Sequence, residues 1–553
     1  MRHCSKLFVL IAILFCLACK DQTKETIETP RIVNIINFIR QTEPRLDEYT
    51  DEVLYQTVVE QVKHLNQYKL PGTFLLQYDA LINPKYQLLL KNDVYPGTEV
   101  GAWWEITQPH VEDAGLVWRG RYSWDWHADV GFATGYTPKE REMLVDVYME
   151  KFKSIFGKYP ASVGSWFIDA HSLAYMHDKY GIVASCNCKD QIGTDGYTLW
   201  GGYWNQAYYP SRKNGYMPAQ TKECQIDVPI FRMLGSDPIY QYDTGLGGMV
   251  QGVISLEPVY KKGGGDRKWV EWFFDVMFND PSLNFNYTQA GQENSFTWNV
   301  MKKGLEIQIP LLDSLRKQKK IRIETLEESG KWFKSKFDVT PPTAFSALTD
   351  IENQGHKTVW FNSRYYRANL LWKNKTFRFR DIHLFDERLQ SNYLDRAGTS
   401  TQCIYTTLPF VDGFVWSTKN DIAGLRFIQL SEDGSKTEIL LNSPVISQPK
   451  DNVLQIECDA DNGAKITMVF YENKFEIISD KFFEWALELT AAPEKELPFS
   501  SIGEKEIKAI WSGFNYTITC NEGTIKAATK TDTYILRLMP INNKLVINCS
   551  NNK

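Results

Sequence analysis

Apolar and polar positions follow two different patterns along the chain, and the change falls near residue 340. In the first part, short apolar runs are each followed by a stretch with apolar residues at helical spacing. Strands are expected at 32–39, 73–80, 99–106, 162–169, 181–188, 227–234, 283–289 and 320–326, and helices at 51–68, 80–92, 138–156, 170–180, 297–317 and 327–337. This order predicts an α/β fold, a parallel sheet closed into a (β/α) barrel of seven or eight strands.

Beyond residue 340, short segments alternate apolar and polar residues with a period of two, and turn residues separate them. Helix signals are nearly absent there, so the C-terminal part is predicted to be an all-β, sandwich-like domain. The expected organisation is a leader at 1–19, a tether at 20–30, a barrel at 31–340 and a β-sandwich domain at 341–553. The β-domain either binds a ligand itself or braces the barrel, and bracing is the default interpretation.

The N-terminus has the pattern of a secretory leader. Arg2 and Lys6 precede an apolar run that ends in Cys-Leu-Ala-Cys. This ending resembles the lipobox of bacterial lipoproteins, which would make Cys19 the lipidated residue, although Cys16 stands where leucine is usual. The following Lys-Asp-Gln resembles the export tag of surface lipoproteins in Bacteroidota-type bacteria. The prediction is an outer-membrane lipoprotein, with cell-surface exposure as an option; the alternative is ordinary secretion with cleavage near Ala18.

Composition and charge limit the kinds of molecule that this protein is expected to bind. The formal net charge is −5 and becomes more negative without the leader, and no basic patch is present, so nucleic acid is not an expected partner. Seven cysteines follow Cys19, an odd number at low density that does not form a disulfide framework. Aromatic residues make up 14%, and eight of the 17 tryptophans lie between Trp103 and Trp204. Such density requires a large core or a surface that grips flat ligands.

Common catalytic signatures are missing. The chain contains no GxSxG elbow, no HExxH helix and no glycine-rich loop with phosphate-binding spacing.

Carboxylates and other polar side chains instead follow many of the predicted strands. The C-terminal ends of barrel strands carry the chemistry in this fold, and paired carboxylates between aromatic walls are what glycoside hydrolysis requires. Each acid has an alternative role as a helix cap or an arginine partner, and for Asp169 that role is the N-cap of the next helix. The catalytic candidates are Asp169, which is favoured, Glu293, Glu105 and Asp125. The substrate-binding candidates are Arg40, Glu43, Trp103, Trp104, Trp126, His127, His171, Asp190, Gln191, Asp195, Trp200, Asp237 and Gln292.

The segment 120–136 raises a separate question. Read as extended chain, it places Asp125, His127 and Asp129 on one face and Trp124 and Trp126 on the other. Three ligands on one strand face are an unusual metal site. We therefore expect no cofactor, with a metal at these three residues as the less favoured option. The segment is interpreted as a loop on the active face, and its tryptophans either stack on sugar or form the loop's own core.

In the middle of the predicted barrel, a helix leads to Phe156-Gly157 and Pro160, then to a strand, then to a helix ending in Lys179-Tyr180-Gly181. This order of elements resembles polysaccharide deacetylase-like and related glycoside hydrolase barrels. The whole chain is also similar to a group of uncharacterised Bacteroidota lipoproteins with a barrel and a C-terminal β-domain. Deacetylases of this kind carry a metal site of one aspartate and two histidines. Here Trp103 and Thr107 occupy the histidine positions, so that metal site is not carried over.

These observations lead to one main hypothesis and two alternatives. The main hypothesis is a lipid-anchored glycoside hydrolase that uses paired carboxylates in a tryptophan-lined barrel cleft. The alternatives are a glycan-binding lipoprotein without catalysis and a metal-dependent deacetylase with a non-standard site. A glycan substrate and a membrane reached through the lipid are the expected partners.

Overall fold

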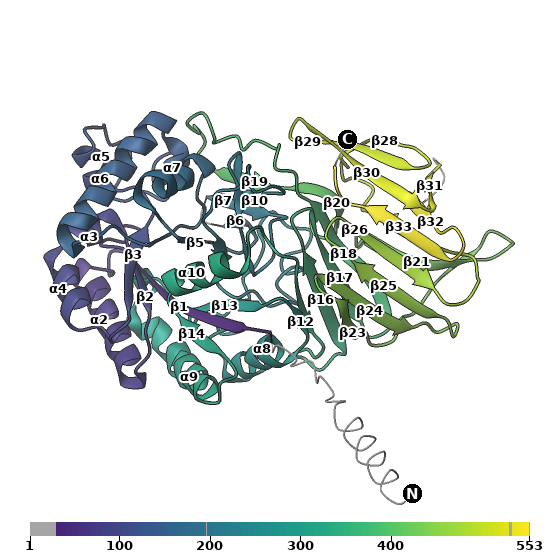
Figure 1. The fold of residues 1–553 in the computed structure, drawn as a ribbon, viewed down its shortest axis with the longest axis horizontal. Coiled ribbons are helices and arrows are strands. Elements are labelled where there is room, and N and C mark those ends of the chain that lie inside the picture. Colours follow the sequence, from purple (N-terminus) through teal and green to yellow (C-terminus); the bar gives the residue numbers. More distant parts are fainter. Residues whose placement is uncertain (1–28, 195, 530–532, 552–553) are drawn as a thin grey trace, which may run out of the picture.

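The computed structural model describes residues 29–194, 196–529 and 533–551 (Figure 1). The leader, Cys19, most of the tether and Asp195 lie outside these residues. Within the described ranges, no helix combines the length and the apolar character that crossing a bilayer requires.

The N-terminal part is a nearly closed barrel. Seven parallel strands of the described chain follow one another in the order β13, β1, β2, β3, β4, β5 and β11. Their bounds are β13 (Asn286–Ala290), β1 (Arg31–Ile39), β2 (Thr73–Leu76), β3 (Glu99–Trp103), β4 (Ser162–Gly164), β5 (Ala184–Asn187) and β11 (Ile230–Arg232). The short antiparallel strand β8 (Ala207–Tyr208) continues the sheet beyond β11.

A side chain bridges the remaining gap between β11 and β13. The Gln289 Oε1 atom accepts a hydrogen bond of 2.9 Å from the Leu234 backbone N–H, and its Nε2 donates to the carbonyls of Ile36 and Ala290. The predicted parallel barrel is therefore confirmed. The expected strand at 162–169 is much shorter than predicted, because β4 ends at Gly164 and the chain bends at Trp166 and Phe167.

The eighth expected strand is not one of the strands that form the barrel wall. β14 (Arg322–Glu324) pairs only with the start of β1, and α10 (Leu326–Lys336) then crosses the N-terminal ends of the strands. The Thr73 hydroxyl at the start of β2 accepts from the Leu326 N–H at 3.0 Å, and Phe333 is fully buried against Phe231. Helix α10 thus closes the N-terminal end of the barrel.

The other helices surround the barrel (Figure 1). Their bounds are α2 (Asp51–Tyr68), α3 (Tyr78–Ile82), α4 (Pro84–Asn92), α5 (Gln108–Asp113), α6 (Pro138–Phe156), α7 (Ala170–Tyr180), α8 (Arg267–Asn279) and α9 (Trp298–Lys317). Thr137 and Glu140 form a reciprocal capping box at the start of α6, which coincides with the helix expected at 138–156. The expected helix 80–92 is divided at Asn83, whose side chain caps α4. Helix α8 is absent from the sequence-based expectation.

The C-terminal domain is a sandwich of two antiparallel sheets (Figure 1). The larger has 11 strands: β12 (Ser282–Leu283), β15 (Thr343–Ala347), β16 (His356–Asn362), β17 (Tyr366–Lys373), β18 (Thr376–Leu384), β20 (Leu408–Asp412), β21 (Gly424–Leu430), β22 (Lys436–Glu438), β27 (Trp485–Thr490), β31 (Thr524–Ala527) and β32 (Leu536–Met539). The smaller has eight: β23 (Val445–Lys450), β24 (Val453–Asp459), β25 (Lys465–Phe470), β26 (Lys474–Ser479), β28 (Phe499–Ile502), β29 (Glu506–Trp511), β30 (Phe514–Glu522) and β33 (Lys544–Asn548).

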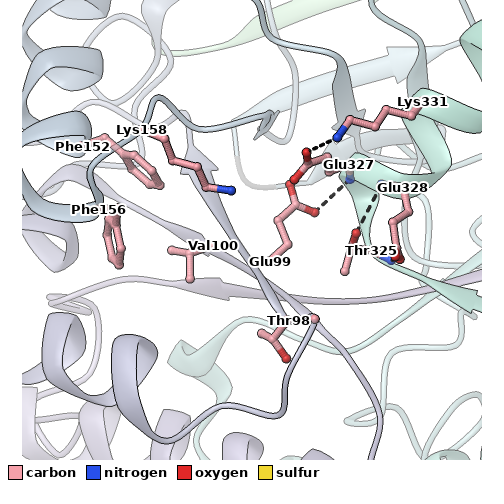
Figure 2. A pocket seen from close by; sticks show the side chains of 11 residues that line it. Thr98, Glu99, Val100, Phe152, Phe156, Lys158, Thr325, Glu327, Glu328 and Lys331 are labelled. Carbon is pink, nitrogen blue, oxygen red and sulfur yellow. Dashed lines mark hydrogen bonds and ion pairs between the residues drawn. The ribbon is translucent and has the colours of Figure 1, made fainter.

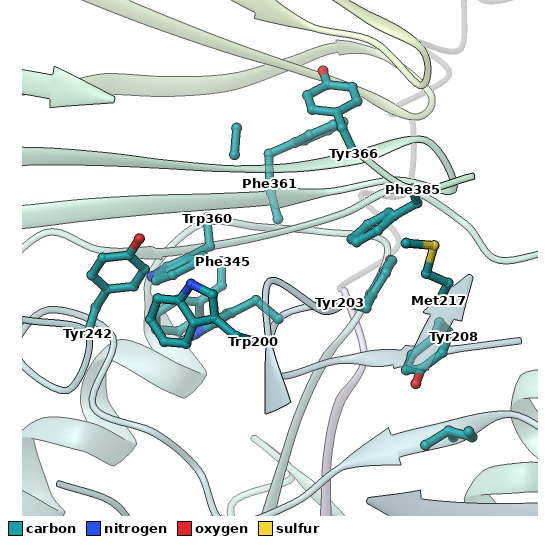
Figure 3. Close-up of a cluster of buried hydrophobic side chains, with 14 of the residues drawn as sticks. Trp200, Tyr203, Tyr208, Met217, Tyr242, Phe345, Trp360, Phe361, Tyr366 and Phe385 are labelled. Carbon is teal, nitrogen blue, oxygen red and sulfur yellow. The ribbon is translucent and has the colours of Figure 1, made fainter. Parts of the chain in front are cut away.

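The two parts share strands and one apolar core. β12 comes from the barrel half of the chain but pairs with β15, and the hairpin β6 (Gln191–Thr194) and β7 (Tyr197–Trp200) pairs with β19 (Cys403–Thr406). A small hairpin of β9 (Pro210–Ser211) and β10 (Asn214–Pro218) lies nearby in the chain. Figure 3 shows aromatic side chains from both parts in this core, where Trp204 stacks on Trp360 at 4.5 Å between ring centres. The sandwich therefore braces the barrel.

Candidate functional site

Four of the residues proposed from the sequence meet at the C-terminal end of the barrel. Arg40, Glu43, Glu105 and Glu293, together with Gln77, form what we call the Arg40 cluster. Arg40 Nε and Nη2 bind the two oxygens of Glu105 at 3.0 and 2.8 Å, and Arg40 Nη1 lies 3.2 Å from Glu293 Oε2. The Gln77 amide donates to Glu105 at 2.7 Å. The cluster forms because β13, β1, β2 and β3 are neighbours in the sheet.

Burial makes Glu293 a weaker acid than an ordinary glutamate. It raises the pKa of Glu293 to about 7, with a further contribution from the nearby Glu105 charge, and Arg40 and the Ser295 hydroxyl oppose this rise only in part. Asp79, just after β2, behaves similarly: burial raises its pKa to about 7, and Glu105 adds to the effect. By contrast, the pKa of Glu43 is lowered although burial would raise it, because Arg45 binds its carboxylate. The cluster thus places a carboxyl that titrates near neutral pH beside a second carboxylate bound to the same arginine.

The polar network continues across the barrel mouth from Glu293. Its neighbour Gln292 donates to Glu257 at 3.1 Å, and Glu257 also accepts from the Ser255 hydroxyl at 2.6 Å. Lys189, at the end of β5, is buried nearby, and burial lowers its pKa. Gln292 is among the candidates proposed from the sequence, whereas Lys189 and Glu257 are not. The position of Lys189 directly after a predicted strand was a usable signal.

A stack of alternating arginines and aromatic rings covers the cluster on one side. The Arg40 guanidinium lies 4.1 Å from the ring centre of Trp124, and Arg45 lies 5.3 Å from Trp124 and 5.6 Å from Trp126. Arg121 follows at 4.6 Å from Trp126. The Arg45 side chain is 32% exposed, whereas those of Arg40 and Glu105 are buried. Arg45 and Trp126 therefore form the side of the cluster that reaches solvent.

Asp125, His127 and Asp129 do not lie along an extended segment, as the sequence had suggested. The Asp125 carboxylate binds Arg121 at 2.8 and 2.7 Å and accepts from the His127 backbone N–H, so the chain turns here. Burial would raise the pKa of Asp125, but Arg121 and backbone N–H groups lower it to about 2. Throughout the described ranges, no group of three His, Cys, Asp or Glu side chains is arranged to hold a metal ion.

Asp169 is integrated into the start of α7. Its Oδ1 caps the helix by accepting from the Ser172 N–H at 2.9 Å, and Arg141 Nη1 lies 3.0 Å away. Both side chains are buried. The alternative role of Asp169 as an N-cap is therefore present in the structure.

Replacing Asp169 by asparagine is expected to lower the free energy of unfolding by about 1.5–3 kcal/mol, because a charged hydrogen-bond acceptor of Arg141 is lost. The loss is limited because backbone carbonyls such as those of Ala133 and Arg396 also bind Arg141. Urea denaturation measures this change, with the exposed Asp178→Asn on the same helix as the control. If the Asp169→Asn variant remained folded but lost glycan cleavage, Asp169 would have to be a catalytic residue.

The other proposed site residues lie in four places. Trp103 stacks on Phe38 inside the barrel at 4.1 Å, and Trp104 packs edge-on against His110 and Tyr148. His171 pairs with Glu142 on the helices at 3.3 Å. The residues that face the sandwich or the loop after β11 are Asp190, which binds Arg232 and Arg367, Trp200, which donates to Asp412, Gln191, which accepts from Lys189, and Asp237, which accepts from Trp269.

Two sizeable hollows lie away from the Arg40 cluster. One, of about 440 Å³, is at the N-terminal end of the barrel between β3, α6 and α10. Figure 2 shows Glu99, Lys158 and Phe152 around it, and the Glu99 carboxylate accepts from the Glu327 N–H at 2.9 Å. Because Glu99 also accepts from Thr73, it ties α10 to the barrel strands. The second hollow, of about 800 Å³, lies beside the loop after β11.

Comparisons with known proteins define the fold. No family model matches the chain, and no curated protein matches it. Among solved structures, a protein from Parabacteroides distasonis assigned as a glycoside hydrolase/deacetylase is 18% identical, with a TM-score of 0.51 over 69% of this chain and 91% of that one. A protein from Mycobacterium smegmatis assigned as a polysaccharide deacetylase is 10% identical, covering 56% of this chain and 91% of that one at a TM-score of 0.33.

The chain therefore has the fold of glycoside hydrolase/deacetylase-like barrels, followed by a β-sandwich domain. This confirms the resemblance seen in the sequence at the level of the fold. The activity has to be argued from the site, because a fold alone does not set function.

Proposed function

We propose that this protein is a carbohydrate-active enzyme, a glycoside hydrolase whose catalytic pair is Glu293 and Glu105. The observation that carries the proposal is the sharing of Arg40 by these two acids at the C-terminal end of the barrel. Because both carboxyl groups contact nitrogens of one guanidinium, their separation cannot exceed about 10 Å, the upper end of the range that glycoside hydrolysis uses.

In the proposed reaction, Glu293 is the proton donor. Its pKa of about 7 leaves a substantial protonated fraction at neutral pH, so it can protonate the leaving glycosidic oxygen. Glu105 is the partner carboxylate, oriented by Arg40 and Gln77, and its negative charge faces the positive charge that develops on the sugar. A water molecule then adds to the anomeric carbon and gives its proton to the carboxylate of Glu293, which restores the proton donor. Asp125 and Asp169 have no part in bond breaking in this scheme.

Access to the pair requires movement of Arg45. This side chain lies between Trp124 and Trp126 above the buried acids. We propose that an incoming sugar ring displaces Arg45 and stacks on Trp126, which is partly exposed. The exchange of one flat cationic group for a sugar face would retain the aromatic packing.

Glycan binding without cleavage is the second candidate function. One observation favours it: each of the acids Glu105, Glu293, Asp125 and Asp169 has an arginine within salt-bridge distance. A glycan library assayed for released product, with Glu293→Gln as the paired variant, separates the two functions. Product release that depends on Glu293 supports the hydrolase, and binding with no release over long incubation rejects it.

We also propose a lipid anchor at Cys19 that holds the protein at the outer membrane. The support is the leader sequence alone. Expression of Cys19→Ala beside the natural chain tests it: the variant should appear in the soluble fraction and the natural chain in the membrane fraction. Equal distribution of the two would reject the anchor.

A further inference from the structure

A smaller hollow, of about 190 Å³, lies on the sandwich, and we call it the Arg426 hollow. Its lining residues belong to β17, β18, β21 and β22 of the larger sheet or, in the case of Ile422, to the loop before β21. The volume is below the roughly 300–1,000 Å³ of sites that enclose a drug-sized ligand. The hollow therefore suits a small ion or a single charged group of a larger molecule.

Two arginines on neighbouring strands face this hollow. The buried Phe379 of β18 pairs with the buried Leu425 of β21, and the two strands are antiparallel. Arg378 precedes this pair on β18 and Arg426 follows it on β21, so both side chains leave the outer face of the sheet. The pKa of Arg426 is lowered, first by burial and then by the charge of Arg378. The two guanidinium groups therefore approach each other closely enough to repel.

The charge of Arg426 is not neutralised by a protein carboxylate. Glu488 lies directly opposite Arg426 on β27, but its two oxygens bind Lys436 at 2.6 Å and Arg537 at 2.8 Å. Glu438, on β22, is the other acid whose charge acts on Arg426. Over the ranges that the structure describes, neither acid nor any other carboxylate comes within salt-bridge distance of this half-buried guanidinium.

Cations outnumber acids in and around the hollow. The lining carries three cations and one acid, namely Lys373, Arg378, Arg426 and Glu438. The nearest further acid is Asp243, which lies 3.1 Å from Arg378, 3.6 Å from Arg380 and 3.7 Å from Lys373. When Asp243 and Arg380 are added, four cations still face two acids, so the excess of positive charge remains.

The Arg426 guanidinium is held in place and retains donors for a ligand. It donates to the Thr490 hydroxyl at 2.7 Å and to the Ile422 carbonyl at 2.9 Å. These neutral acceptors use two of the five N–H groups of a guanidinium and leave its charge intact. A planar guanidinium held in this way matches two oxygens of one oxyanion.

We propose that the Arg426 hollow binds an oxyanion, a sulfate, phosphate or carboxylate group, with Arg426 as its principal ligand and Arg378 and Lys373 beside it. The bound anion would offset the repulsion between the two arginines. The sandwich would then have a binding role in addition to bracing the barrel. The anion is either a free ion or a charged group of a glycan. The site is independent of the proposed function, because none of its residues belongs to the Arg40 cluster.

Titration calorimetry with the full-length protein at constant ionic strength tests this site. The probes are inorganic sulfate, inorganic phosphate, galactose 6-sulfate, glucuronate and uncharged galactose. We expect at least one anionic probe to bind several-fold more tightly than galactose. Tighter binding of galactose 6-sulfate or glucuronate than of the inorganic ions identifies a glycan group, and the reverse order identifies a free ion. If no anion bound more tightly than galactose, the inference would be overturned.

Charge variants assign the binding to this hollow. Arg426→Gln should weaken binding of the preferred anion by at least about 10-fold, because a charged donor pair is lost. Glu438→Gln removes the acid of the lining and should strengthen binding by roughly 2–5-fold. The control is Lys508→Gln on β29 of the smaller sheet, an exposed lysine whose loss should change nothing. Unchanged affinity in Arg426→Gln would reject the site.

Thermal unfolding gives a second readout. Sulfate raises the Tm of most proteins because it is excluded from their surfaces, so the natural chain and Arg426→Gln are compared at the same sulfate concentration. Specific binding to the folded protein should give the natural chain the larger rise. An equal rise in both proteins would contradict the proposal. If Arg426→Gln did not fold, the affinity of Glu438→Gln would decide, and an unchanged value would reject the site.

Discussion

Replacement of Glu293 by glutamine is expected to lower glycan cleavage by about 10²–10⁴-fold without unfolding the protein. Glutamine has the same shape and can keep contact with Ser295, but it cannot donate a proton to a leaving oxygen. Initial rates on the glycan identified by the library screen measure the loss. The matched control is Glu306→Gln, an exposed ion-paired residue of α9.

The same residue sets an expected pH dependence. Because the donor must be protonated and the pKa of Glu293 is about 7, kcat/KM should fall as the pH rises through about 7. The variant should lack this alkaline limb. Full activity of Glu293→Gln, or an unchanged alkaline limb in that variant, would show that another group donates the proton.

Replacement of Arg40 by methionine is expected to cost about 3–5 kcal/mol of unfolding free energy. The change leaves Glu105 and Glu293 buried together without their shared cation, and uncompensated buried charge is strongly destabilising. Urea denaturation of the variant and the natural chain measures the difference.

A double variant provides a second test of this prediction. Adding Glu105→Met to Arg40→Met removes one of the orphaned carboxylates, so the double variant should recover part of the lost stability. A single variant that loses less than about 1 kcal/mol would contradict the assignment of Glu105 as an ionised partner that depends on Arg40.

The fold could be predicted because its signals are local. The apolar run at 32–39 and the Thr137 cap at the start of α6 lie within a few residues of what they determine. The hairpin of β6 and β7 escaped prediction because its partner, β19, is about 200 residues further along the chain. The eighth expected strand became an edge strand with a closing helix, which depends on how Phe333 fills the barrel end.

The site could be predicted only in part. Arg40, Glu105 and Glu293 meet because each follows a strand of the same sheet, and strand order determines their distances. Sequence position alone could not separate them from Asp169, which also follows a strand, because the deciding partner is Arg141 on the preceding helix.

The contact of Arg367 with both Asp190 and Asp381 has an evolutionary consequence. Asp190 follows barrel strand β5, whereas Arg367 and Asp381 belong to the sandwich. The side chains of Arg367 and Asp381 are fully buried, and that of Asp190 is 10% exposed. If recombination replaced the sandwich by an unrelated domain, Asp190 would keep Arg232 but lose Arg367 as a partner. The ring of Trp204 would lose its packing against Trp360. We therefore expect the barrel and the sandwich to be inherited together, without exchange of either domain between genes.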